Sequence, residues 1–474
     1  MDSKPARRTS LLIAGIAATM VALLATAASP ILGAREASRG DPQHAHGCSA
    51  MSLDNNGYAV FGYNKDHDYV RGYVVVNKRY IAKSGWEPST TGEYAAWVSK
   101  YGSVTFNHAG YQLPSAGMNE AGLMISTHAL DETENPAADE RPPLVSALWV
   151  QYVLDNFSTV EEVLASDAHV RISDTVDHYL VCQRTGDCAA VEFLGGQMVH
   201  HSGTTLPVKA LTNNTYEDSV AAWRAGSAGA RGEVNSLYRF GIVADRVVAF
   251  EPNSADAAAG YAFETLALAS MEATGASIPT AWSIVFDAEN MRVFFRTYKN
   301  QEIRTIDFSE LDFWCDSPAQ VLDVHAQLSG DISDGIPEYS HEVNLDHTFE
   351  SLEVFGIEIP SLLVRALVWG VERSPCMEDA GALPYPGGVP LLLPPVFVWP
   401  GLQLLKRSSL IWAALVAVSL AVFVWDQTRG ARVSRRKRAA WGLMVVLFGP
   451  IGLLIYWLAY RRHHRAQGPA AAAG

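Results

Sequence analysis

Apolar and polar residues alternate in short runs through much of the first half of the chain. The runs occupy residues 48–125 and 179–201, and a period of two is typical of strands with one buried face. Two other segments, residues 142–166 and 236–251, have apolar residues at helical spacing. The pattern predicts an α+β domain in which two antiparallel sheets lie between helices.

Longer apolar stretches lie near both ends of the chain. Residues 11–28 follow the basic residues Lys4, Arg7 and Arg8 and precede small residues, which is the layout of a secretory signal. An uncleaved anchor helix and a twin-arginine signal are the alternatives. Export from the cytoplasm is the prediction.

The C-terminal part of the chain predicts membrane anchoring. Residues 409–425 and 439–460 are each near the length that crosses a bilayer. The basic loop 429–438 between them is expected to stay in the cytoplasm, which leaves the preceding domain outside. The proline-interrupted segment 389–405 favours an interfacial or re-entrant position, because a third span would move the basic loop outside.

Composition limits the choice of function. The 474 residues are 49% hydrophobic and 18% charged, enough for one large or two medium cores. The formal net charge of -14 argues against a nucleic-acid partner. The histidines fall in no H-E-x-x-H setting and the cysteines in no C-x-x-C setting, so neither a metal nor a cofactor is predicted.

The chain has an odd number of cysteines for an exported protein. They are Cys48, Cys182, Cys188, Cys315 and Cys376, so at least one is expected to stay free or to pair between chains. Cys182 and Cys188 flank a glycine-containing turn, where they either form a disulfide across a hairpin or remain two buried thiols. Cys315 and Cys376 have no geometry that the sequence reveals. Cys48 is the expected unpaired cysteine.

Cys48 follows the signal-like segment and opens a predicted strand. The preceding residues, "HAHGC", lack the Leu three positions before the cysteine that is typical of lipoprotein processing, so a lipid anchor is not favoured. A cysteine that becomes N-terminal carries its own base, since a free α-amine has a pKa of about 7.7 to 8.0. The position therefore predicts an N-terminal nucleophile.

Several motifs follow Cys48 in a fixed order. They are the G-x-N-x-D pattern of Gly62, Asn64 and Asp66 and the segments 97–126, 207–219, 236–240 and 280–297. The series resembles the choloylglycine hydrolase family, which includes penicillin V acylases and conjugated bile salt hydrolases, within the N-terminal-nucleophile superfamily. This resemblance implies a four-layer αββα sandwich, here followed by C-terminal transmembrane helices.

The resemblance also implies roles for individual residues. Cys48 matches the nucleophile whose α-amine acts as base, and Asp66 matches the carboxylate that orients this amine. Asn213 matches the asparagine that donates to the developing oxyanion, with Asn214 beside it as the alternative. Arg239 matches an arginine that stabilises charge around the thiolate.

Two positions bear on the surroundings of the nucleophile. The second oxyanion donor in the family is a backbone N–H near Ala129, where many members have a larger residue; this points to a different substrate pocket. Many members have an arginine where this chain has Tyr63, so part of the usual positive environment is expected to be missing.

The sequence divides into four expected parts. They are a signal and propeptide, 1–47; an amide hydrolase domain, 48–345; a linker and membrane-proximal segment, 346–408; and two transmembrane helices with a basic loop and tail, 409–474. The expected protein is membrane-anchored, with its catalytic domain on the extracytoplasmic side. A homo-oligomer is left open.

The function implied by the resemblance is hydrolysis of the linear amide bond of a small N-acyl substrate. Penicillin V, bile-acid conjugates, N-acyl homoserine lactones and N-acylated amino acids fit, and the membrane tether favours the first and third over bile salts. A rival is a Cys–His protease with His108 or His128 as base. Another is a membrane-anchored sensor that binds acyl amides without turnover, which Tyr63 favours.

Overall fold

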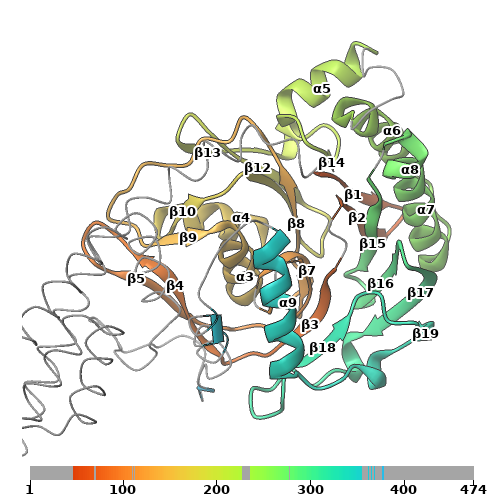
Figure 1. Cartoon of the computed structure of the whole chain (residues 1–474). Helices are drawn as coiled ribbons and strands as arrows, with labels where there is room; N and C mark the ends of the chain where they lie inside the picture. Colours follow the sequence, from red (N-terminus) through yellow and green to blue (C-terminus); the bar gives the residue numbers. More distant parts are fainter. Residues whose placement is uncertain are drawn as a thin grey trace, which may run out of the picture. The chain divides into compact units, whose positions relative to one another are not determined.

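The structure describes most of the region 48–345, where the sequence predicts a globular domain. The computed structural model describes residues 46–68, 71–108, 110–111, 113–226, 235–276 and 278–354, with positions 361, 364–365, 368 and 376–377. All of these belong to one unit, Gly40–Val396 (Figure 1). The apolar segments 11–28, 389–405, 409–425 and 439–460 lie outside the described residues. Within the described ranges, no helix has both the length and the apolar character needed to cross a membrane.

The first sheet is built around the hairpin that carries Cys48. Its two-residue turn, Asn56 and Gly57, has positive φ at both positions, which is the conformation that an Asn-Gly pair favours between antiparallel strands. The sheet has seven strands, in the spatial order β14 (Ala210–Leu211), β1 (His46–Asn55), β2 (Tyr58–His67), β15 (Thr280–Asp287), β16 (Arg292–Thr297), β17 (Asn300–Asp307) and β19 (Gly330–Asp331). All neighbours are antiparallel except β17 and β19.

The second sheet has eight strands, and its neighbouring strands are all antiparallel. Their spatial order is β13 (Gln197–Ser202), β12 (Cys188–Leu194), β11 (Asp177–Cys182), β8 (Met124–Ala129), β7 (Pro114–Asn119), β6 (Ser103–Asn107), β3 (Tyr73–Asn77) and β18 (Gln320–Asp323). Two small sheets accompany it, β4 (Ala82–Pro88) with β5 (Tyr94–Val98) and β9 (Pro143–Val145) with β10 (Arg171–Asp174). The prediction of two antiparallel sheets is confirmed.

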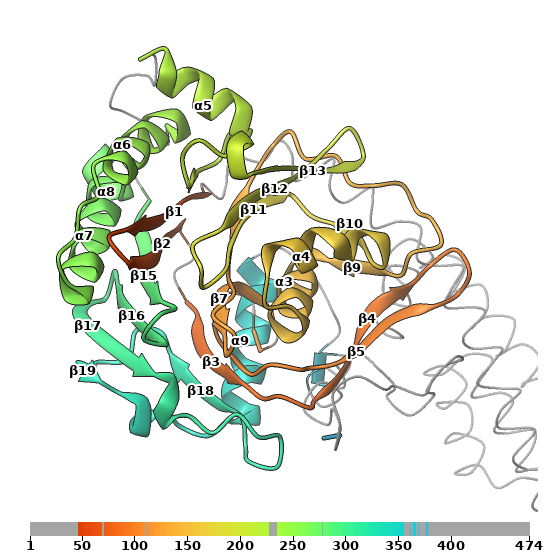
Figure 2. The ribbon, with the colours of Figure 1, turned by 180° about the vertical axis from the view of Figure 1, so that it is seen from behind.

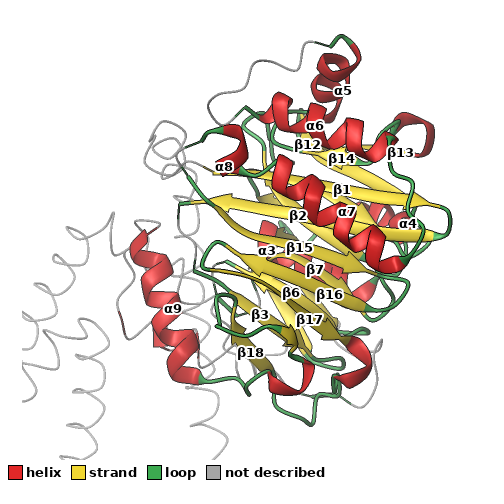
Figure 3. Ribbon diagram, turned by 90° about the vertical axis from the view of Figure 1, so that its right-hand side faces the viewer, coloured by secondary structure: helices red, strands yellow, loops and turns green. Residues whose placement is uncertain are grey.

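Helices cover the outer faces of the two sheets (Figures 2 and 3). On the first sheet, α6 (Ser236–Val248) packs on β1, and α7 (Ala255–Leu268) packs on β2 and β15. On the second sheet, α3 (Ser146–Asn156) packs on β7 and β8. The other α-helices among the described residues are α4 (Val160–Ala165), α5 (Tyr216–Arg224), α8 (Met271–Thr274) and α9 (His341–Val354). The order of layers is helix, sheet, sheet, helix, as expected.

Alternation along β11 shows how the second sheet separates two cores. Leu180 and Cys182 join the core that also contains residues of the first sheet, such as Cys48. Tyr179 and Val181 join the core under α3. Side chains of β11 at even positions therefore face the first sheet.

The segment 142–166, expected to be helical, contains a short strand and two helices. Thr159 begins the second helix, α4, through a capping box: its hydroxyl accepts from the Glu162 backbone N–H, and the Glu162 side chain accepts from the Thr159 N–H. The expected helix at 236–251 exists as α6 and ends at Val248. The sequence pattern did not predict α5, α7, α8 or α9.

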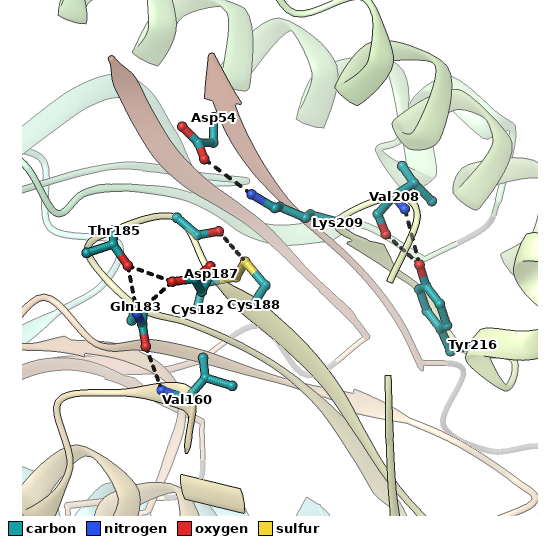
Figure 4. The surroundings of a disulfide bond; sticks show 11 residues. Asp54, Val160, Cys182, Gln183, Thr185, Asp187, Cys188, Val208, Lys209 and Tyr216 are labelled. Carbon is teal, nitrogen blue, oxygen red and sulfur yellow. Dashed lines mark hydrogen bonds and ion pairs between the residues drawn. A yellow bond between two sulfur atoms is a disulfide. The ribbon is translucent and has the colours of Figure 1, made fainter. Parts of the chain in front are cut away.

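Disulfides settle the alternatives left open for four cysteines. Cys182 and Cys188 form a disulfide across the β11–β12 hairpin (Figure 4). Gln183, in the turn that this disulfide closes, accepts a hydrogen bond from Val160 N at 2.8 Å, so the turn also caps α4. Cys315 pairs with Cys376, and Cys48 is the free cysteine. The expectation that Cys48 stays unpaired is confirmed.

Candidate active site

The β1–β2 hairpin places Cys48 and Asp66 on opposite faces of the first sheet. Cys48 is directly opposite Lys65, and Gly47 is directly opposite Asp66. Because opposed residues share a face and successive residues alternate, the thiol and the carboxylate point to different sides. The Gly47–Cys48 peptide bond lies between them.

The thiol of Cys48 is buried and meets one hydroxyl group. Its Sγ lies 3.4 Å from the Tyr63 hydroxyl, which donates to Thr127 O at 3.0 Å. Burial raises the pKa of the Cys48 thiol, and the Lys65 charge and the Tyr63 hydrogen bond oppose this effect in part. Burial also raises the pKa of Tyr63 well above its ordinary value, so the phenol stays protonated. Tyr63 thus places a neutral hydroxyl group where a cation was expected to be missing.

Arg239 approaches the hairpin from α6, on the other face. Its Nη1 donates to Cys48 O at 2.5 Å and to Ser49 Oγ at 2.7 Å. Its Nη2 donates to Asn213 Oδ1 at 2.7 Å. The guanidinium is fully buried, and burial lowers its pKa although Asp66 opposes this effect. Arg239 therefore fixes the Cys48 backbone and brings positive charge to it.

Asp66 is a buried carboxylate with one oxygen satisfied. Its Oδ1 accepts from Thr280 Oγ1 at 2.6 Å, and its Oδ2 lies 3.8 Å from Arg239 Nη1. Oδ2 has no hydrogen-bond partner among the described residues. Burial raises the pKa of Asp66 to about 6 against the lowering effect of Arg239. A donor near Oδ2 would stabilise the ionised carboxylate.

Gly47 occupies the space beside that oxygen. A Cβ on Gly47 would lie 3.4 Å from Asp66 Oδ2 and 3.1 Å from Arg239 Nη2, and it would clash with Met271 Cε. The backbone before Cys48 therefore passes through a tight, charged and buried space, and any side chain here would displace a neighbour.

Asn213 connects the first sheet to the end of β8. Its Oδ1 accepts from Cys48 N at 2.9 Å, and its Nδ2 donates to Ala129 O at 2.9 Å. Its own backbone N–H donates to Ser236 Oγ at 2.7 Å, at the start of α6. Of the two adjacent asparagines, Asn213 is thus the one that hydrogen-bonds to Cys48 and Arg239. Among the described residues, no such bond joins Asn214 to this cluster.

The two histidines of the rival protease prediction are not paired with the thiol, although the ring of His128 packs against Tyr63 at 5.5 Å between centroids. His128 Nε2 pairs with Ser126 Oγ at 2.9 Å, and no hydrogen bond joins its ring to Cys48 Sγ. Burial, followed by the effect of His178, lowers the pKa of His128 well below its ordinary value. The ring of His108 packs against His67 at 4.6 Å between centroids. Neither arrangement makes a thiol–imidazole pair.

Sequence reasoning identified the residues that contact Cys48 but missed their supports. The structure brings together Cys48, Tyr63, Asp66, Ala129, Asn213 and Arg239. The missed residues are Ser49, Lys65, Ser236 and Thr280. A signal existed for the first two, since they adjoin Cys48 and Asp66 in the sequence; the partners from α6 and β15 needed the fold.

Comparison with known proteins indicates a family. Residues 48–223 match the model of the linear amide C-N hydrolases, choloylglycine hydrolase family. A penicillin V acylase of Pectobacterium atrosepticum is 29% identical over 271 residues, which are 47% of this chain and 70% of that protein.

Solved structures are similar as well. The penicillin V acylase of Agrobacterium tumefaciens is 24% identical, with a TM-score of 0.54 over 62% of this chain and 98% of its own. A variant of the conjugated bile acid hydrolase of Clostridium perfringens is 19% identical, with a TM-score of 0.49 over 60% of this chain and 98% of its own. The similarity to the first shows the fold, a sandwich of two sheets between helices.

Proposed function

The chain belongs to the linear amide C-N hydrolases of the choloylglycine hydrolase family, and from this premise we propose that Cys48 is its N-terminal nucleophile. The observation that carries the proposal is the pairing of Gly47 with Asp66. Removal of the residues before Cys48 would leave an α-amine beside the buried Asp66 Oδ2, which has no hydrogen-bond partner among the described residues. An ammonium or amine at this point would satisfy that oxygen.

In the proposed reaction the α-amine of Cys48 takes the thiol proton, and the sulfur attacks the carbonyl carbon of the substrate amide. The C–N bond then breaks, and the leaving amine takes the proton from the α-ammonium. A water molecule next gives a proton to the α-amine and attacks the thioester. The acyl group leaves as a carboxylic acid, and Cys48 recovers its thiol.

Asp66 and Arg239 would set the basicity of the α-amine. Asp66 favours the ammonium form, which raises the amine pKa, and Arg239 opposes this effect. The distance of 3.8 Å between Arg239 Nη1 and Asp66 Oδ2 supports the proposal that these two charges act on the α-amine pKa in opposite directions. The two residues together would keep the pKa of the α-amine near neutral pH, so that the amine can both accept and return a proton.

Asn213 would donate to the oxyanion. A side-chain amide has two N–H groups, and in the unprocessed chain one of them donates to Ala129 O. The other would meet the developing negative charge, together with a backbone N–H near Ala129. One preorganised donor of this kind lowers the activation barrier by roughly 3 kcal/mol.

The proposed substrates are N-acyl amides with an apolar acyl group. The sequence similarity to a penicillin V acylase supports phenoxyacetyl amides as the first class to test. N-acyl homoserine lactones are the second, because a membrane tether would bring the domain to lipophilic amides. Two disulfides in the described domain support an oxidising, extracytoplasmic location.

The test is a panel of penicillin V, a bile-acid conjugate, an N-acyl homoserine lactone and an N-acylated amino acid, scored by released amine. Protein shown to begin at Cys48 is expected to release amine from at least one, and Cys48→Ala from none. Asn213→Ala is expected to lower kcat roughly one hundred- to one thousand-fold. Release by neither Cys48 protein nor Cys48→Ala would favour a binding domain without turnover, and equal release by both would exclude Cys48 as nucleophile.

A further inference from the structure

A buried histidine–glutamate pair lies behind Asn213, between the two sheets. His178 is on β11 and Glu192 is on β12, and both side chains are fully buried. The strand register pairs Tyr179 with Val191, so the next step places His178 opposite Glu192. The disulfide between Cys182 and Cys188 joins the same two strands four residues away, on the same face.

The pair holds both ends of the segment that carries Asn213. His178 Nε2 lies 2.8 Å from Thr212 O, the carbonyl directly before Asn213. Glu192 Oε1 lies 3.0 Å from His178 Nδ1 and accepts from Tyr216 N at 2.8 Å, where α5 begins. The three residues between these two anchor points include Asn213 itself.

The chemistry of these contacts fixes the orientation of the imidazole ring. A carbonyl oxygen can only accept, so His178 Nε2 must carry the hydrogen that bonds Thr212 O. Glu192 at Nδ1 prevents the ring from turning over, because a turned ring would place carbon atoms opposite Thr212 O and Glu192 Oε1 and lose both contacts in a buried site. Truncation of one partner of such a pair leaves the other buried and unpaired.

The opposite side of the segment is held by α6. Thr212 Oγ1 bonds Ser236 Oγ at 2.9 Å, and Asn213 N donates to the same Ser236 Oγ at 2.7 Å. The segment is thus clamped between α6 and the second sheet. We propose that His178, oriented by Glu192, is a positioning residue that sets the place of the Asn213 amide relative to Cys48.

This inference rests on the proposed role of Asn213 and adds a residue that acts on Asn213 through the Thr212 carbonyl. An oxyanion donor must be held within a fraction of an ångström, because its contribution exists only when it is in place before charge develops. The pair supplies that constraint through the backbone of Thr212.

Two near-isosteric variants separate the two contacts of His178. In His178→Gln, the side-chain amide nitrogen occupies the position of Nε2 and retains the bond to Thr212 O. In His178→Asn, the side-chain amide nitrogen occupies the position of Nδ1 and retains only the bond to Glu192. His178→Gln is expected to keep kcat within threefold of the unmodified enzyme, and His178→Asn to lose at least tenfold. KM is expected to change less than threefold in both. The kcat of Glu192→Gln, which retains an acceptor for Tyr216 N, is expected to lie between those of the two His178 variants.

A purely structural role would give a different result. It would lower the melting temperature and kcat of the two His178 variants alike, so equal losses overturn the proposal, as does full activity of His178→Asn. Asp155→Asn, which alters another buried ion pair, with Lys83 at 2.9 Å, is the matched control: it is expected to lower stability and leave kcat per folded molecule unchanged. In an Asn213→Ala background, His178→Asn is expected to cause no further loss of kcat.

A crystal structure of His178→Asn separates this inference from the proposed function. If the unmodified protein hydrolyses none of the panel, the proposed function fails, yet the structure still reports on positioning. Displacement of the Asn213 amide from Cys48 N and Ala129 O is the expected result. An Asn213 side chain that keeps both bonds overturns the inference whatever the activity.

Discussion

Tyr63 shows how one residue can replace the expected charge near the nucleophile. The phenol has a single proton, which it donates to Thr127 O while the thiol faces its oxygen. When the sulfur ionises, the same proton can turn to the thiolate, because the phenol itself stays protonated. The hydroxyl group can therefore donate a hydrogen bond to the thiolate once the thiolate forms.

Removal of that hydroxyl group by Tyr63→Phe should make the thiol less acidic. A hydrogen bond to a charged group contributes about 1.5 to 3 kcal/mol, so alkylation of Cys48 by iodoacetamide at pH 7 should slow roughly tenfold or more. The pH profile of alkylation measures the shift. Tyr179→Phe is the control, since its buried hydroxyl bonds Ser146 and Thr175 under α3; an equal slowing in both variants would contradict the role of Tyr63.

Asp66 should make the stability of the unprocessed chain depend on pH. Its pKa in the folded chain, about 6, lies above its ordinary value of 3.8, so the folded state binds more protons between these values. The free energy of unfolding should therefore fall as pH rises from 4 to 7, by at most about 3 kcal/mol. Asp66→Asn should lack this part of the slope. Urea unfolding of chains shown to retain Gly47 tests it, and parallel pH profiles would count against a raised pKa.

At this scale the sequence identified the groups that carry recognisable chemistry. Cys48, Asp66, Asn213 and Arg239 stand in ordered motifs, and the structure brings all four together. It could not reveal Thr280, whose hydroxyl reaches Asp66 only because β15 pairs with β2. A serine or threonine in a strand has no local sign that its partner lies far along the chain.

At the scale of elements, the β11–β12 hairpin joins three features of the domain. Its disulfide closes the turn, the turn caps α4, and the other end of the two strands presents His178 and Glu192 behind Asn213. The register of one strand pair thus affects both stability and the site. A one-residue slip would turn His178 away from Thr212.

The two disulfides should differ in their contribution to stability. They link residues 6 and 61 positions apart, and closure of a longer loop restricts the unfolded chain more. Replacing Cys182 and Cys188 by alanine should cost about 2 kcal/mol, and replacing Cys315 and Cys376 about 4 kcal/mol. Urea unfolding in oxidising buffer measures both; a larger cost for the shorter loop would argue against a mainly entropic contribution.

Element prediction succeeded where the pattern was strong and failed where small residues carry it. The helix at α6 has a clear apolar face and an Asn235 cap. The buried face of α7 includes Ala258, Ala259 and Ala262, and alanine does not stand out from its neighbours in a hydropathy pattern. The pattern over 142–166 predicted helix without a break, whereas α4 begins separately at the Thr159 capping box. A capping box is a local signal that apolar periodicity does not detect.

At the scale of the whole molecule, the local pattern predicts two sheets but not how their strands are ordered. In the first sheet β2 pairs with β15, more than two hundred positions away, and β14 joins β1. These pairings bring Thr280 to Asp66 and the Asn213 segment to Cys48. The four-layer order followed from the family resemblance, because hydropathy alone does not define strand order.

The predicted membrane topology has a direct test. A cysteine introduced into the basic loop 429–438 should resist an impermeant thiol reagent in whole cells, since such loops stay in the cytoplasm. A cysteine at an exposed position of the described domain, Leu268→Cys, should react. Lysed cells should label both and serve as the control. The reverse pattern would mean an inverted protein or a third span.

The central claim is that Cys48 becomes N-terminal and carries the acyl group of the substrate. The measurement that tests it most directly is rapid-quench peptide mass spectrometry during turnover of a substrate from the active class. The account predicts an N-terminal peptide that begins at Cys48 and bears the acyl group as a thioester. Turnover with Cys48 unmodified, or by protein that retains Gly47, would contradict it.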